Sequence, residues 1–253
     1  MPPGRDHAVT FVGTSWKMTK TQQESREFAR ELVRWSGWGE AVRPFILPTH
    51  LSLAAVRQVV PRESGLLVGA QNGHWEESGA FTGDVSMTQL ADAGAELVEI
   101  GHSERREHSN ERDEAIVRKV HAALRAGISP IVCIGEIQPV RDLGAHVDFV
   151  RGQALQALAG LDAASRRRVL IAYEPVWAIG PAGRPPRETE VAEVVAAIAA
   201  DHPDIAGVLY GGSVSVANAR DLLDIDGVSG LFIGRGAWNV ADFMEIISLA
   251  ASR

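Results

Sequence analysis

The chain has 253 residues, of which 45% are hydrophobic and 23% charged, a composition typical of a globular protein and not of a disordered one. Its formal net charge of −7 at pH 7 argues against non-specific binding to nucleic acid or to an acidic membrane surface, so we expect no nucleic-acid or membrane partner. An anionic small molecule would need a local positive field at its binding site.

The cysteine and histidine content bears on where the protein is located and on whether it binds a metal. Cys133 is the only cysteine, so no disulfide can form within the chain, and we expect a reducing, cytoplasmic location. The N-terminal residues show no basic segment followed by a long apolar run, and no apolar run is long enough to span a bilayer. His102 and His108 share a charged segment without a second pair of ligands, so we expect no metal and no other cofactor.

Short apolar runs alternate with longer segments of helical periodicity from one end of the chain to the other. The runs are apolar throughout, which is typical of parallel strands covered on both faces. No linker or change of composition divides the chain, so we predict an α/β fold with one domain over residues 1–253, closed as a (β/α)₈ barrel. The predicted strands cover residues 9–13, 44–47, 66–70, 97–100, 128–133, 169–172, 207–210 and 230–233, and the helical stretches include residues 21–35, 111–126, 147–158, 188–200 and 216–223.

An open, doubly wound sheet is the alternative architecture. Against it, no G-x-G-x-x-G follows the first strand, and glycine-rich turns follow the last two strands instead. In a barrel, functional residues gather in the loops after the carboxyl ends of the strands. Those loops are therefore where the sequence should carry its chemistry.

Glu174 follows the sixth predicted strand and precedes an apolar loop that contains Trp177 and Gly180. A carboxylate covered by such a loop loses contact with water when the loop closes, which raises its pKa and makes it a stronger proton acceptor. The alternative is a structural glutamate paired with a nearby cation. On this stretch alone, the structural interpretation is the commoner one.

Lys17 follows the first predicted strand and His102 the fourth, so both side chains can reach the same end of the barrel. A lysine there would supply a positive charge for an anionic or polarised substrate. Ser103 and Glu104 could cap a short helix after His102, and a helix N-terminus beside an imidazole favours its neutral form. Taken singly, a solvated lysine and a structural histidine are the simpler interpretations.

Glycine-rich turns follow the last two predicted strands, at residues 211–213 and 234–236. Glycine lets the backbone approach a ligand closely, and N–H groups at a helix start bind phosphate, which barrels often hold at this pair of loops. A phosphate site, a lysine, an imidazole and a covered carboxylate at one end of a barrel suit proton abstraction next to a carbonyl. We therefore predict an aldose-ketose isomerase that acts on a small phosphorylated sugar through an enediolate.

Seven short segments stand out along nearly the whole chain. They are SWKM (15–18), GAQN (69–72), GAFTG (79–83), GHSERR (101–106), CIGE (133–136), AYEPVWAIG (172–180) and YGGSV (210–214). In this order and spacing the segments are highly specific, and with them the chain resembles the triosephosphate isomerase family. That family is the standard example of a glutamate base with a neutral histidine, so the roles given to Glu174 and His102 are not independent of this resemblance.

The resemblance implies a TIM barrel and a role for each matched residue. Lys17 would contact the substrate, with Glu104 as a supporting carboxylate. His102 would be the electrophile and Glu174 the base, while Cys133 would be buried. Ser15 would face the substrate, and the phosphate would be bound at Gly180, Ser213, Gly234 and Arg235.

The family also forms homodimers, in which the loop after the third strand places a threonine near the partner's active site. GAFTG puts Thr82 in that position, so the resemblance implies a homodimer with Thr82 in the interface loop. Phe81 and Trp75 add apolar surface that is otherwise awkward in a loop. The alternative is a loop folded on its own subunit.

Four departures from the family pattern change what faces the substrate. Ser15 stands where the family has asparagine, so a short hydroxyl replaces a longer amide and leaves room for a larger substrate. The far end of the loop after Glu174 reads PAGRPP (181–186), where the family usually has Thr-Gly-Lys, and proline fixes φ. Arg235 lies in a loop that is usually Gly-Gly-Ala-Ser, and Asp84 replaces a glutamate of the interface loop.

These departures leave the catalytic set complete and three functions open. The first expectation is the interconversion of dihydroxyacetone phosphate and glyceraldehyde 3-phosphate, because on this fold that activity is far commoner than isomerisation of a tetrulose phosphate. The alternative is isomerisation of a tetrulose phosphate, L-erythrulose 1-phosphate, because GTSWKM (13–18), His74-Trp75 and GRGAWNV (234–240) resemble that branch. The third is a barrel that binds a phosphorylated metabolite without catalysis.

Overall fold

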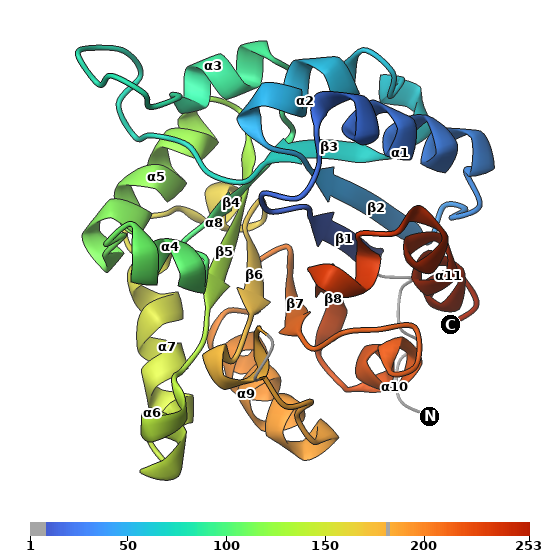
Figure 1. The fold of residues 1–253 in the computed structure, drawn as a ribbon. Coiled ribbons are helices and arrows are strands. Elements are labelled where there is room, and N and C mark those ends of the chain that lie inside the picture. Colours follow the sequence, from blue (N-terminus) through green and yellow to red (C-terminus); the bar gives the residue numbers. More distant parts are fainter. Residues whose placement is uncertain (1–8, 181–182) are drawn as a thin grey trace.

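The structure is a computed structural model that describes residues 9–180 and 183–253. Its eight strands form a closed parallel barrel in chain order, with β8 paired back to β1 (Figure 1). The predicted (β/α)₈ barrel is confirmed, and the open sheet is wrong. The strands are β1 (Thr10–Ser15), β2 (Val42–Leu47), β3 (Leu67–Ala70), β4 (Leu97–Ile100), β5 (Ser129–Ile134), β6 (Leu170–Tyr173), β7 (Gly207–Gly212) and β8 (Val228–Ile233).

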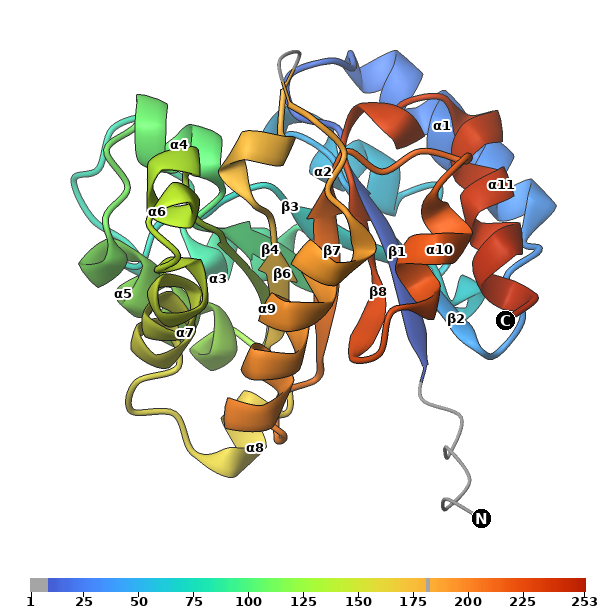
Figure 2. The ribbon, with the colours of Figure 1, turned by 90° about the horizontal axis from the view of Figure 1, so that it is seen from below.

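Helices cover the outside of the barrel, as Figures 1 and 2 show. Among the described residues, no helix is long and apolar enough to cross a membrane. The α-helices are α1 (Gln22–Trp35), α2 (His50–Arg57), α3 (Met87–Asp92), α4 (Ser103–His108), α5 (Asp113–Arg125), α6 (Gln138–Asp142), α7 (His146–Ala157), α8 (Ala163–Arg166), α9 (Glu188–Asp201), α10 (Ala219–Asp224) and α11 (Val240–Ala251). The short 3₁₀ helices are η1 (Arg62–Ser64), η2 (Val176–Ala178) and η3 (Arg235–Ala237).

Local sequence accounts for several element boundaries. Helix α1 begins after Thr21, whose hydroxyl accepts a hydrogen bond from the backbone N–H of Glu24, while the Glu24 carboxylate accepts one from the backbone of Thr21. Strand β4 has the predicted bounds. Strand β7 runs two residues beyond its predicted end, because Gly211 and Gly212 continue the ladder with β8.

The barrel interior is filled by side chains. The rings of Phe45 and Phe232 stack with their centroids 5.7 Å apart. Gly13 makes room for them, because a Cβ there would lie 2.0 Å from the Phe45 ring. These side chains form a floor beneath the carboxyl ends of the strands. The interior residues are Phe45, Leu47, Leu97, Ile131, Cys133, Leu170, Ala172, Leu209 and Phe232.

The carboxyl ends of the parallel strands meet at one end of the barrel. Figure 2 shows β1 running from the lower end of the molecule to the upper end, where the other strands also finish. The loops that carry the predicted site residues therefore gather at one end, as the barrel topology requires.

Candidate active site

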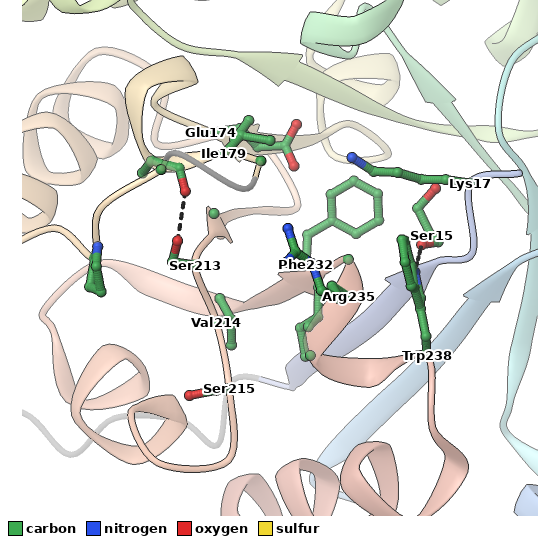
Figure 3. Close-up of a pocket in the computed structure, with 18 of the residues that line it drawn as sticks. Ser15, Lys17, Glu174, Ile179, Ser213, Val214, Ser215, Phe232, Arg235 and Trp238 are labelled. Carbon is green, nitrogen blue, oxygen red and sulfur yellow. Dashed lines mark hydrogen bonds between the residues drawn. The ribbon is translucent and has the colours of Figure 1, made fainter. Parts of the chain in front are cut away.

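One cavity of about 770 Å³ opens at the carboxyl ends of the strands (Figure 3). It brings together the residues expected to contact or support the substrate, from five different loops. Thr82 does not line it. The predicted residues that do are Ser15, Lys17, His102, Glu104, Glu174, Gly180, Ser213, Gly234 and Arg235.

Lys17 is held in an uncommon backbone conformation. Its φ is +49°, in the left-handed region that non-glycine residues seldom adopt. The side-chain amide of Gln71 donates to the carbonyl oxygens of Lys17 (3.0 Å) and Leu47 (2.9 Å), which fixes the loop in this shape. Figure 3 shows the lysine side chain extending across the cavity toward Glu174.

The lysine is also paired. Nζ of Lys17 lies 2.6 Å from Oε1 of Glu104. Partial burial of Glu104 acts to raise its pKa, but the hydrogen bond and charge of Lys17 outweigh that effect, so the pKa lies below its usual value. Glu104 therefore stays ionised and holds the ammonium group in the cavity.

His102 is itself the N-cap of α4. We expected Ser103 and Glu104 to cap this helix, and that expectation is wrong, because Nδ1 of His102 accepts the backbone N–H of Glu104 at 3.1 Å. With Nδ1 as acceptor, the proton of the neutral ring is assigned to Nε2. Nε2 lies 3.7 Å from Oε2 of Glu174, and both residues line the cavity.

Glu174 is 6% exposed, and its Oε2 is buried without a hydrogen-bond partner in the described part of the chain. No lysine or arginine of that part lies within ion-pair distance, so the structural-pair interpretation is not supported. The carboxylate has room because a Cβ on Gly211 would lie 2.6 Å from its Cγ. A buried carboxylate oxygen left without a partner is costly unless a ligand supplies one.

The loop after β6 is anchored at its near end by η2. Nε1 of Trp177 donates to Oε1 of the buried Glu136 at 2.7 Å. The guanidinium of Arg184 lies over the Trp177 ring, 4.2 Å from its centroid. The hydroxyl of Ser213 donates to the carbonyl oxygen of Ala178 at 2.7 Å, which joins this loop to the loop after β7 (Figure 3).

The far end of the same loop is only partly described. The predicted departure at this end is the segment PAGRPP (181–186). Its first two residues, Pro181 and Ala182, lie outside the residues that the structure describes. Pro185 and Pro186 precede α9 in an irregular segment. Arg184, immediately before them, forms two hydrogen bonds with Glu190 of α9, at 2.9 and 2.8 Å.

The loops after β7 and β8 present free backbone donors. Among the described residues, the N–H groups of Ser213, Gly234 and Arg235 have no hydrogen-bond acceptor. The two loops touch because position 236 is glycine, where a Cβ would lie 2.2 Å from the carbonyl oxygen of Val214. The Arg235 side chain is exposed, lines the cavity and has no ion-pair partner in the described chain. This end of the cavity can therefore bind an anion.

Glu99 is a site residue that the sequence reasoning missed. It lies within β4, is 3% exposed, and accepts a hydrogen bond from the hydroxyl of Ser15 at 2.8 Å. Burial raises the pKa of Glu99 to about 7. The available signal was a charged residue inside an otherwise apolar strand run.

Trp238 was also missed as a positioning residue. Its Nε1 donates to the carbonyl oxygen of Ser15 at 3.0 Å, and its own carbonyl oxygen accepts from Nζ of Lys20 at 2.7 Å. These two hydrogen bonds connect the loop after β8 to the loop after β1, and Figure 3 shows the contact with Ser15.

Thr82 lies in the segment between β3 and α3, which projects from the barrel (Figure 1). Its side chain is exposed. Nearby, the His74 ring packs against Trp75 and Phe81, with centroids 4.3 and 4.5 Å apart. Among the residues with described positions, no group of three or more histidine, cysteine or acidic side chains is placed to hold a metal ion.

The geometry matches one known family. The family model described as "Triosephosphate isomerase" matches residues 10–250. The chain belongs to the triosephosphate isomerase family. A triosephosphate isomerase from Bartonella henselae, known from a crystal structure, superimposes with a TM-score of 0.83 and 32% sequence identity, covering 95% of this chain and 98% of that chain.

Other members of the triosephosphate isomerase family are more similar in sequence. The L-erythrulose-1-phosphate isomerase of Mycolicibacterium smegmatis is 47% identical, over 97% of this chain and 94% of that protein. The one from Rhizobium etli is 43% identical, over 95% and 92%. The chain is thus an isomerase of phosphorylated sugars, and these relatives favour the tetrulose alternative over our first expectation of a triose phosphate.

Proposed function

We propose that the chain isomerises L-erythrulose 1-phosphate. The observation that carries this proposal is the 47% and 43% identity, over nearly whole chains, to proteins named for that substrate, against 32% to the triosephosphate isomerase structure. The site agrees with a larger substrate, because Ser15 replaces the longer asparagine and turns its hydroxyl toward Glu99.

The two candidate substrates share their reacting atoms. L-Erythrulose 1-phosphate is dihydroxyacetone phosphate with one hydroxymethyl group added to C3. In both, a proton on C3 is acidified by the carbonyl at C2. The same groups can therefore serve either substrate, and the difference between them lies at the end away from the phosphate.

In the proposed mechanism, the Glu174 carboxylate takes the proton from C3. The electrons of that C–H bond form the C2–C3 double bond, and O2 becomes negatively charged. The N–H of His102 stabilises the enediolate, and the charge of Lys17 balances it. Glu174 then returns the proton to C2 while the proton on O3 passes to O2, which leaves the carbonyl at C3.

This proton transfer gives different product classes with the two substrates. With the triose, C3 is terminal, so the product is an aldehyde. With the tetrulose, C3 carries the hydroxymethyl group, so the product of one transfer is a second ketose with the phosphate at the opposite end of its numbering. The class of the product, aldehyde or ketose, therefore identifies which of the two substrates has reacted.

The phosphate is proposed to bind at the end of the cavity where backbone donors are free. The N–H groups of Ser213, Gly234 and Arg235 are without acceptors in the described chain, and Gly180 lines the same cavity. The Arg235 guanidinium would add the local positive charge that an acidic protein needs to attract an anion. The loop after β6 would exclude water from the enediolate, which can otherwise expel phosphate.

A homodimer through the loop after β3 is the proposed assembly. The loop projects from the barrel, Thr82 is exposed, and Phe81 is 43% exposed. Two large apolar side chains lie exposed at the site end of the barrel, Met18 at 94% and Leu51 at 86%. A second subunit packed against this end of the barrel would cover these apolar side chains.

The proposed substrate is tested by steady-state assays of the purified protein with L-erythrulose 1-phosphate and with dihydroxyacetone phosphate. We expect kcat/KM to be higher for the tetrulose phosphate and the product to be a ketose. A higher kcat/KM for the triose phosphate would restore the triose alternative. Turnover of neither substrate would favour a barrel that only binds a phosphorylated metabolite.

A further inference from the structure

A second cavity of about 400 Å³ adjoins the first. The two share four lining residues, Ser15, Lys17, His102 and Glu104, so they meet at the catalytic groups. The groups proposed to bind phosphate line only the first cavity. The second cavity, which we call the side pocket, is thus where a substrate held by its phosphate would place a substituent beyond its reacting carbons.

The inner wall of the side pocket contains Glu99, Gln71 and Asn72. The side chains of Gln71 and Asn72 already form hydrogen bonds within the protein. The amide nitrogen of Gln71 donates to the carbonyl oxygens of Lys17 and Leu47, and Oδ1 of Asn72 accepts from Lys119 at 2.8 Å.

Glu99 is different. Its Oε2 accepts from Ser15, while its Oε1 has no hydrogen-bond partner among the residues described. The residue is 97% buried, yet its carboxyl group reaches the pocket. A polar atom placed this way needs a partner from a ligand or from water.

We propose that Glu99, supported by Ser15, binds the terminal hydroxymethyl group of a four-carbon sugar phosphate and so sets the preference for that substrate over a three-carbon one. The inference rests on the proposed function. A hydroxyl group is both donor and acceptor, so it can pair with Oε1 in either protonation state of the carboxyl. The raised pKa of Glu99 agrees with a carboxyl that exchanges its proton near neutral pH.

The outer rim of the side pocket has a different character. Met18 on the rim is 94% exposed, whereas Ser15 and Glu99 at the inner end are 4% and 3% exposed. In the proposed homodimer, a second copy would cover the rim and leave the inner end to the substrate. The two occupants therefore do not compete for Glu99.

The test is the ratio of kcat/KM for L-erythrulose 1-phosphate to that for dihydroxyacetone phosphate, measured for the full-length wild type, Glu99→Leu and Glu99→Gln. Leucine keeps the bulk and removes the hydrogen bond, so we expect the ratio to fall by about tenfold or more. Glutamine can still pair with a hydroxyl group and should retain most of the ratio. A site built to bind a hydroxyl group discriminates by this interaction, which a purely structural glutamate would not supply.

Glu96→Gln is the matched control, because Glu96 directly precedes the same strand but pairs with Arg57, 2.9 Å away, outside both cavities. Its ratio should equal that of the wild type. An equal loss for both substrates in Glu99→Leu would overturn the subsite and leave the proposed function standing. A wild type that prefers the triose phosphate would instead overturn the proposed function, whatever Glu99 does.

Discussion

Nε2 of His102 lies 3.7 Å from Oε2 of Glu174, a buried oxygen without a hydrogen-bond partner in the described chain. Both residues line the cavity, so a substrate bound there can contact the two atoms together. Neither residue is committed to another side chain at these atoms. A buried carboxylate oxygen without a partner lowers the stability of the folded protein, and a bound substrate supplies the missing interaction.

Glu174→Gln should lower kcat by about 10³-fold, because an amide cannot accept the C3 proton, and general base catalysis contributes on this scale. Inhibition by inorganic phosphate should be nearly unchanged, because the free backbone donors are in other loops. Loss of solvent deuterium incorporation at C3, followed by NMR, reports the proton transfer itself. Continued incorporation in the variant would exclude Glu174 as the base, and Glu188→Gln on the surface of α9 serves as the control.

Lys17→Met should lower kcat/KM by about 10²-fold or more, since it removes the positive charge that balances the enediolate. Glu104→Gln should have a smaller effect, about tenfold and mainly on KM, because the lysine keeps its charge and loses only the carboxylate 2.6 Å from it. Steady-state kinetics of both variants with the preferred substrate separate these outcomes. If the two variants lost activity equally, the proposed division between charge and positioning would be wrong.

Glu99→Gln should stabilise the protein at high pH. The pKa of Glu99 is raised to about 7, so the folded state keeps a proton that the unfolded state releases above about pH 4.5. Stability is therefore lost as the pH rises through that interval, and the amide avoids the loss. Urea unfolding at a fixed protein concentration should show no difference at pH 4 and a gain of about 3 kcal/mol at pH 8.

The control for this prediction is Glu96→Gln, whose carboxylate is more exposed and paired with Arg57. It should show no comparable gain at pH 8. A constant difference between wild type and Glu99→Gln at every pH would mean that the variant acts through packing and not through the proton.

Thr82→Arg should convert the proposed dimer to a monomer, because it places a long charged side chain at the tip of the interface loop. Sedimentation velocity at micromolar concentration measures the change directly. Leu155→Arg is the control, since Leu155 is 64% exposed on α7, far along the chain from that loop. If Thr82→Arg remained as associated as the wild type, the loop would be folded on its own subunit or the contact would lie elsewhere.

The barrel could be predicted from sequence because its strands are continuous apolar runs, and their regular alternation with amphipathic segments admits few topologies. Leu97–Ile100 was predicted to the residue for this reason. Gly211 and Gly212 were placed in a turn, because glycine usually ends a strand. In the structure both glycines pair with residues of β8, so the strand continues through them. The sequence around the two glycines does not predict this pairing, because the partner strand follows later in the chain.

The candidate site was predictable where a motif marked a loop, and not where a contact crosses the barrel. Lys17, His102 and Glu174 each follow an apolar run, and the closed topology brings them together. Glu99 in β4 and Trp238 in the loop after β8 both contact Ser15, from positions 84 and 223 residues away along the chain. No local pattern reports such a pairing, because it depends on the register of a complete barrel.

The contact of Trp238 with Ser15 has a consequence for how the protein is made. The first loop of the site is fixed by the side chain of Trp238, which lies 223 residues after Ser15 in the chain. A nascent chain on the ribosome therefore carries Lys17 long before that loop is held in place. The isomerase site becomes complete only when the final strand and its loop have left the exit tunnel.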